Sequence, residues 1–94
     1  MRIEGVIWRR DVVDKLISKH DVETYEVEQV LDSEPKIRFV EKGKRAGEDV
    51  YMALGQTDAG RYLAVLFIYK QTKEALIMST RDMETHERRQ YGKK

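Results

Sequence analysis

The sequence predicts one α+β domain in which helices come first and strands follow. Residues 62–69 form an unbroken run of apolar or aromatic side chains, the pattern of a buried central strand. Between residues 10 and 33 apolar side chains recur at helical spacing. A chain of 94 residues can enclose one modest core and has no room for a second. Residues 1–94 are therefore expected to fold as a single domain.

Two helices are predicted after a short strand at residues 3–8. In residues 10–19 the apolar side chains lie on one side of a helical wheel, which indicates an amphipathic helix. His20 follows near the middle of that apolar stripe, where the helix C-terminus favours a protonated ring; a half-buried histidine bonded to a carbonyl is the alternative. The second helix, at residues 25–33, is capped by Glu23 or Thr24 and ends before Pro35.

The pattern changes to strands after Pro35. Strands are predicted at residues 36–40, 50–55, 62–69 and 75–78, the last one leading into Ser79-Thr80-Arg81. The loop of residues 41–49 carries Lys42, Lys44 and Arg45. A final helix at residues 83–91, expected to start from an Asp82 cap, has almost no apolar stripe. It must dock weakly or through polar contacts.

A meander of these strands predicts which side chains meet. A turn near residue 58 would place Leu54 or Gly55 beside Arg61. The preceding hairpin would place Lys36 beside Leu54. Basic side chains from three strands then gather at one end of the sheet, namely Lys36, Arg38, Arg61 and Arg81, and Glu48 lies at the far end. Which of these cations share a face is left open, because a one-residue slip exchanges the faces.

Such a basic cluster has two interpretations. Guanidinium groups make paired hydrogen bonds to phosphate oxygens, so the cluster and the loop with Lys44 and Arg45 suit an anionic partner. Charged strand ends that only protect the sheet edge are the alternative. The charge distribution allows either: residues 1–34 carry 9 acidic and 5 basic side chains, and residues 35–94 carry 8 acidic and 13 basic ones.

Composition limits the chemistry. The absence of cysteine excludes disulfides and thiolate catalysis, and with two histidines it argues against a transition-metal site. The longest apolar run is far below the roughly 20 residues of a membrane helix. The N-terminal residues have no signal-peptide pattern. We expect a cytoplasmic protein without a cofactor, a metal or a membrane contact.

Four segments resemble a known family in order and spacing. They are Trp8 with Lys19-His20, the strand Tyr51-Met52-Ala53-Leu54-Gly55, the Gly60-Arg61 start of the central strand, and Ser79-Thr80-Arg81 leading into a helix with Glu87-Arg88-Arg89-Gln90-Tyr91. Together they are similar to the BrnT toxins. The resemblance implies a RelE-like fold, with two N-terminal helices packed on a twisted antiparallel sheet of four to five strands and a short C-terminal helix.

The resemblance also implies a function. It points to the toxin of a type II toxin–antitoxin system, a metal-independent endoribonuclease that cleaves RNA by attack of a 2′-hydroxyl. A co-encoded antitoxin with a ribbon-helix-helix part would neutralise it and make any DNA contact; ribosome dependence is left open. In this interpretation Arg61 and Arg81 stabilise the transition state, and His20, His86 or Tyr91 transfers protons. The RNA-binding residues would be Lys19, Lys36, Arg38, Lys44, Arg45, Arg88 and Arg89.

The sequence departs from the family pattern at five positions, namely Arg9, Val12, Leu16, Asp21 and Val50. Val12 and Leu16 stand where lysine and asparagine are usual, and Val50 stands where an arginine often precedes the aromatic residue. The valines at positions 12 and 50 therefore remove two phosphate contacts that the resemblance implies. The alternative function is a binding module of the same fold that holds an antitoxin-like partner or RNA without cleaving it. A small metabolic enzyme has little support, since the sequence has no phosphate loop, nucleophile triad or metal-ligand spacing.

Overall fold

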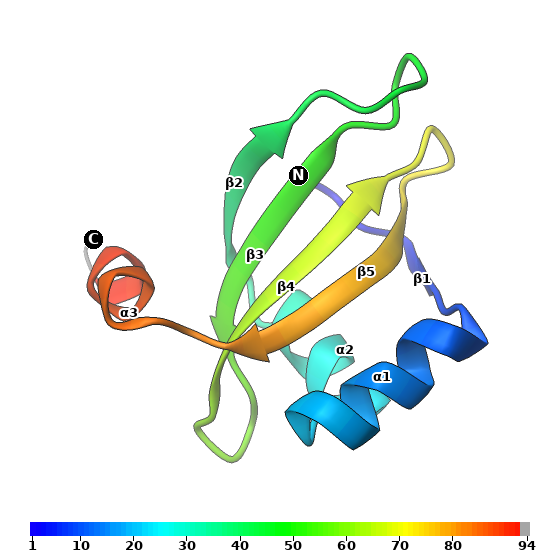
Figure 1. The fold of residues 1–94 in the computed structure, drawn as a ribbon. Helices are drawn as coiled ribbons and strands as arrows, with labels where there is room; N and C mark the ends of the chain where they lie inside the picture. Colours follow the sequence, from blue (N-terminus) through cyan, green and yellow to red (C-terminus); the bar gives the residue numbers. More distant parts are fainter. Residues whose placement is uncertain (93–94) are drawn as a thin grey trace.

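The computed structural model describes residues 1–92, which form a five-stranded sheet with helices on both faces (Figure 1). The elements in chain order are β1 Gly5–Ile7, α1 Arg10–His20, α2 Thr24–Asp32, β2 Lys36–Glu41, β3 Val50–Gln56, β4 Tyr62–Tyr69, β5 Glu74–Asp82 and α3 Thr85–Gly92. The strand order is β1-β5-β4-β3-β2. The apolar run of residues 62–69 is therefore the central strand, as predicted.

The sheet is mixed, whereas the resemblance implied an antiparallel one. Strands β2 to β5 pair as an antiparallel meander, but β1 runs parallel to β5, with Gly5 opposite Glu74. The meander strands are joined by short connections, which force antiparallel neighbours. Two helices separate β1 from the other strands, so no tight turn sets its direction.

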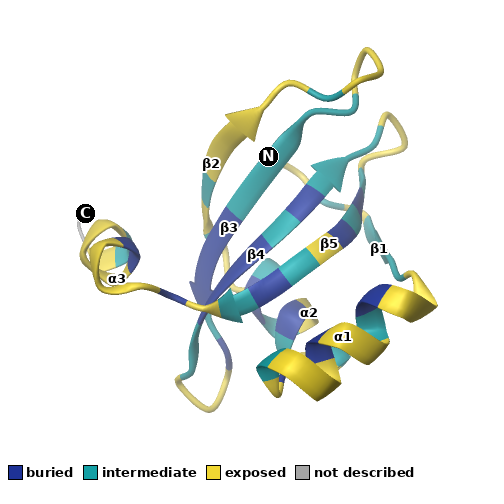
Figure 2. Ribbon diagram, viewed as in Figure 1, coloured by how far each residue is buried: buried dark blue, intermediate teal, exposed yellow. Residues whose placement is uncertain are grey.

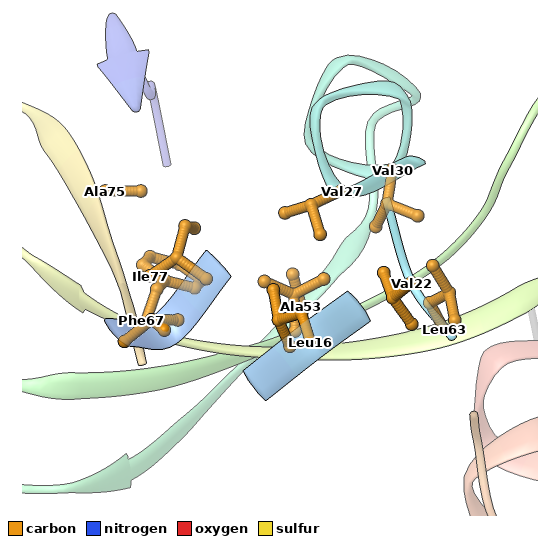
Figure 3. Packing of buried hydrophobic residues seen from close by; sticks show 11 residues of the cluster. Leu16, Val22, Val27, Val30, Ala53, Leu63, Phe67, Ala75 and Ile77 are labelled. Atoms are coloured by element: carbon orange, nitrogen blue, oxygen red, sulfur yellow. The ribbon is translucent and has the colours of Figure 1, made fainter. Parts of the chain in front are cut away.

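The main core lies between one face of the sheet and the two N-terminal helices (Figure 3). Leu16 of α1 and Val27 of α2 pack there with Phe67 of β4, and each is at most 2% exposed. Glu23 is the N-cap of α2, as one of the two predicted caps, and its backbone N–H donates to the Glu26 Oε1 at 3.0 Å. Val22 and Val27 are fully buried on either side of this cap and form the hydrophobic staple of the helix start.

Helix α3 packs on the opposite face of the sheet, which we call the open face (Figure 1). Met83, just before α3, and Tyr91 within it pack against Leu54 and Ala64, at the end of the sheet where β3 and β5 end. Within residues 1–92, no helix covers the rest of the open face, and its side chains on β3 and β4 are mostly half-buried (Figure 2).

Two local predictions are wrong. The first concerns the β3–β4 turn: the N–H of Thr57 donates to the carbonyl of Arg61 at 2.9 Å, so Thr57 rather than Leu54 or Gly55 faces Arg61. Strand β3 continues to Gln56 and the chain reverses at Gly60, which has a φ of +94° that glycine adopts without strain. The prediction that Lys36 faces Leu54 is confirmed.

The second wrong prediction is the Asp82 cap. Strand β5 continues through Asp82, and α3 begins only at Thr85. The Asp82 carboxylate binds the guanidinium of Arg61 instead of helix N–H groups. Within residues 1–92, no helix is both long and apolar enough to cross a membrane.

Candidate functional site

The basic side chains predicted at one end of the sheet do lie there, but on two different faces. Arg81 is paired with Ala64 and Lys36 with Leu54, and both partners belong to the cluster under α3. These two cations are therefore on the open face. The side chain of Arg61 binds α1 and α2 groups and so lies on the helix-covered face.

Arg61 joins several elements through all five of its N–H donors. Its Nε and Nη2 bind the two carboxylate oxygens of Asp82, at 2.9 and 3.4 Å. Nη1 donates to the carbonyl of Asp21 at 2.6 Å and to Glu26 at 3.3 Å, and Nη2 also donates to the carbonyl of His20 at 3.0 Å. The hydrogen bond and charge of Asp82 raise the pKa of this guanidinium. Arg61 thus connects the end of α1, the start of α2 and the end of β5.

Arg81 is held mainly by one carboxylate. Its Nη1 and Nη2 donate to the two oxygens of Glu87, at 2.6 and 2.9 Å, and Nη1 also donates to the carbonyl of Asp82 at 3.1 Å. These bonds use three of the five N–H donors of an arginine. The Arg81 side chain is 35% exposed, whereas that of Glu87 is 3% exposed. Two N–H donors of this partly exposed side chain are not used by these bonds.

Glu87 is a buried carboxylate that accepts three hydrogen bonds. Besides Arg81 it accepts the backbone N–H of Glu84 at 2.9 Å, at the start of α3. The hydrogen bond from Arg81 is the largest influence on its pKa, which falls to about 2. Glu87 is therefore ionised at neutral pH and fixes the orientation of the Arg81 guanidinium.

The two cations of β2 contact the same helix. Lys36 Nζ donates to the backbone carbonyl of Gln90 at 2.6 Å, and Arg38 Nη1 donates to its side-chain oxygen, also at 2.6 Å. A cavity of about 490 Å³ lies between these residues. Polar contacts thus hold α3 to β2 and β5, as its weak apolar stripe predicts.

Aromatic side chains complete this end of the open face. The rings of Tyr62 and Tyr91 meet edge to face, with centroids 6.0 Å apart. The guanidinium of Arg88 lies 4.1 Å from the centre of the Tyr62 ring. Arg89 is exposed on the same helix. Tyr91, Arg88 and Arg81 are therefore brought together around α3.

The structure separates His20 from this group, whereas His86 lies on the same helix as Tyr91. His20 ends α1 on the helix-covered face, half-buried, and its backbone carbonyl binds Arg61. Lys19 is exposed beside it. His86 lies on α3, where its Nδ1 is 3.4 Å from Glu84.

Lys44 and Arg45 lie at the other end of the sheet. Their loop precedes β3 and lies beside Val50, whereas Leu54 and Arg81 mark the α3 end. Val12 and Leu16, where the resemblance led us to expect polar residues, are buried in the main core. Both side chains therefore contribute to the stability of the fold.

Three side chains that organise the site were not predicted from the sequence. Glu87 accepts hydrogen bonds from Arg81, and Gln90 accepts one from Lys36. The ring of Tyr62 packs against the guanidinium of Arg88. One signal was present in the sequence: a helix with little apolar surface must use its charged residues to dock, and Glu87 is an acid six residues after Arg81. Its burial and two-oxygen contact depend on the chain path between β5 and α3.

This end of the open face carries a group of cationic donors. Lys36, Arg38 and Arg81 supply charged donors from two strands, and guanidinium groups match the oxygens of a phosphate. Within residues 1–92, no three His, Cys, Asp or Glu side chains converge in a way that could hold a metal ion.

Comparison with known proteins identifies a family and a similar solved structure. The family model described as the ribonuclease toxin BrnT of type II toxin–antitoxin systems matches residues 8–87. Among solved structures, the chain is similar to the 1.1 Å crystal structure of the Brucella abortus ribonuclease toxin BrnT, with a TM-score of 0.63 and 20% identity, over 86% of this chain and 97% of that one. No curated protein sequence matches the chain significantly.

Proposed function

The chain belongs to the BrnT family, the ribonuclease toxins of type II toxin–antitoxin systems, and on this premise we propose that it cleaves RNA at the α3 end of the open face. The observation that carries the proposal is the Arg81–Glu87 pair. A buried carboxylate fixes a guanidinium that keeps part of its side chain in solvent. Such a preorganised donor suits a charge that develops during a reaction.

The proposed reaction needs no metal. A ribose 2′-oxygen attacks the adjacent phosphorus, the bond to the 5′-oxygen breaks, and the products are a cyclic phosphate and a 5′-hydroxyl. The 2′-hydroxyl proton passes to a base, and the leaving 5′-oxygen gains a proton. Arg81 stabilises the charge on the phosphoryl oxygens, and Lys36, Arg38 and the α3 arginines hold neighbouring phosphates.

Tyr91 is our candidate for proton transfer. It lies on α3, on the same face as Arg81, and packs against Tyr62. His86 is on the same helix and is the second candidate, whereas His20 is on the other face. We assign Arg61 a structural role, because its five donors are all used within the fold.

Two RNA substrates test this proposal. A single-stranded RNA incubated with the purified protein and EDTA should be cleaved to products ending in a 2′,3′-cyclic phosphate. The same oligonucleotide with 2′-deoxyribose at the cleavage position should stay intact. Cleavage of the deoxy-substituted oligonucleotide at that position, or loss of all cleavage in EDTA, would contradict the mechanism.

A binding module without cleavage is the second candidate function. It is favoured by one observation: Arg81, Lys36 and Arg38 are all engaged by α3 groups, so RNA would have to compete for them. Protein that binds the deoxy-substituted oligonucleotide and leaves the unmodified RNA intact would support this candidate.

The family implies an antitoxin partner. We propose that this antitoxin is of the ribbon-helix-helix type, that it alone contacts DNA, and that the pair works in the cytoplasm. Co-expression with the adjoining reading frame should relieve growth arrest, and the purified complex should bind the promoter DNA of the pair. Toxin that binds this DNA without a partner would contradict the assignment.

A further inference from the structure

A hollow lies on the open face at the end remote from Arg81. It has a volume of about 370 Å³ and lies under the loop of residues 42–45. Its floor consists of Val50 and Ile68, a directly paired and half-buried couple of β3 and β4. This pair offers a small apolar surface directly beside a basic loop.

The loop over this hollow is built to hold its shape. The N–H of Gly43 donates to the Asp49 side chain at 3.2 Å, and the N–H of Glu48 donates to the carbonyl of Arg45 at 3.1 Å. A Cβ on Gly43 would lie 1.8 Å from the carbonyl oxygen of Glu48, so only glycine allows this approach. The loop is therefore closed on itself by a backbone hydrogen bond, a bond to the Asp49 side chain and the close backbone approach at Gly43.

The charges around the hollow favour an anionic occupant. Lys42, Lys44 and Arg45 line it, together with the carboxylates of Glu41 and Glu48. The Glu48 carboxylate is bound by Lys70 at 3.1 Å. The net charge of the side chains that line the hollow is therefore positive, and its floor is apolar.

We propose that this hollow is a second nucleotide subsite for single-stranded RNA. One base rests on Val50 and Ile68, and the adjoining phosphates are bound by Lys42, Lys44 and Arg45. The subsite rests on the proposed ribonuclease function and extends it, because it places a second contact on the same face as Arg81. Val50 and Leu54 are four residues apart on β3, about 13 Å at the usual strand rise. An RNA strand running along the open face can therefore reach both sites.

The proposed subsite also assigns a role to the Val50 side chain. A charged side chain at this position would lie on the open face beside Ile68, whereas valine gives the hollow an apolar floor. Phosphate binding is then left to the loop cations, and the position itself supports the base.

The test uses wild-type protein and a probe that cannot react. A fluorescent 2′-O-methyl RNA of about ten nucleotides, within the size range of single-strand sites, lacks the attacking hydroxyl and reports binding alone. The pair K44S/R45S should weaken its binding about tenfold and lower the salt dependence by about 0.7 per lost phosphate contact. The matched pair R10S/K15S removes the same charges from exposed positions on α1 and should have a much smaller effect.

Two further measurements separate a subsite from general attraction. Ile68→Thr keeps a β-branched residue in the strand but removes apolar floor, and it should also weaken binding of the long probe several-fold. A 2′-O-methyl dinucleotide is too short to bind both sites at once, so the advantage of the long probe over the dinucleotide should shrink in K44S/R45S. If K44S/R45S and R10S/K15S behave alike, or if Ile68→Thr binds as the wild type does, the subsite is overturned while RNA cleavage stands. Wild-type protein that neither binds the long probe nor cleaves unmodified RNA would overturn the proposed function and the subsite with it.

Discussion

Arg61 and Arg81 stand at the same end of the sheet, yet the fold uses them differently. All five donors of Arg61 are bound by groups of α1, α2, β5 and the segment between the two helices. Arg81 is oriented by Glu87 from one side and keeps 35% of its side chain exposed. A guanidinium whose donors are all used joins parts of a protein, whereas one that is held from one side can also bind a ligand.

The comparison is sharpest when Arg81 and Glu87 are changed together. The double variant R81Q/E87Q removes both charges and leaves no unpaired ion in the contact. We expect RNA cleavage to fall about a hundredfold or more, as when an oxyanion donor is lost, with little change in unfolding temperature. Cleavage rate and thermal unfolding of the same preparation check this. Full activity in R81Q/E87Q would show that Arg81 is only a support for α3.

Arg61→Met should show the opposite pattern. Removing the guanidinium leaves Glu26 and two carbonyls without their partner, and we expect a loss of roughly 3 kcal/mol in the free energy of unfolding. Urea denaturation measures this loss. At temperatures where the variant is folded, its cleavage rate should stay within about threefold of the wild type. A stable Arg61→Met protein that has lost cleavage would instead restore Arg61 as a transition-state cation.

Glu87→Gln alone tests the electrostatic part of the Arg81 contact through pH. Because the pKa of Glu87 is lowered to about 2 in the folded protein, its charge stabilises the fold at pH values above its ordinary value of 4.5. Wild type should exceed Glu87→Gln by about 2 kcal/mol at neutral pH, and the difference should shrink as the pH falls from 4.5 towards 2. Unfolding in urea across this range measures it. A difference that is constant with pH would mean that shape, and not charge, holds α3.

The smallest effect is expected from His20. Its position on the Arg61 side of the sheet predicts that His20→Gln cleaves within about twofold of the wild type at every pH. Tyr91→Phe, which removes only a hydroxyl on the Arg81 side, should slow cleavage by a larger factor. A pH–rate profile of both variants distinguishes them. If His20→Gln abolishes the rise of rate with pH, the histidine is the base and the two faces share the reaction.

Much of the fold follows from local sequence patterns. The central strand, the cap at Glu23 and the Lys36–Leu54 pairing depend on apolar runs and short connections, which the sequence displays directly. The polar docking of α3 follows from its lack of an apolar stripe. Such features require no knowledge of distant contacts.

The faces of the arginines could not be predicted in the same way. An error of two or three residues in the β3–β4 turn changes which residue meets Arg61, and side-chain direction changes with every residue along a strand. The Arg81–Glu87 contact depends further on where β5 stops, and the sequence suggested that Asp82 already capped the helix. The direction of β1 could not be predicted from the sequence either, because no short turn joins β1 to the strand it pairs with.

The parallel pairing of β1 with β5 makes the order of synthesis matter. Gly5 leaves the ribosome early, but its partner Glu74 follows about seventy residues later, so the sheet cannot be completed until nearly the whole chain has emerged. The strand that β1 awaits is also the one that carries Arg81. The edge of the sheet and its exposed arginine are thus assembled together, late in synthesis, and an antitoxin present at that moment would meet a toxin that has only just become complete.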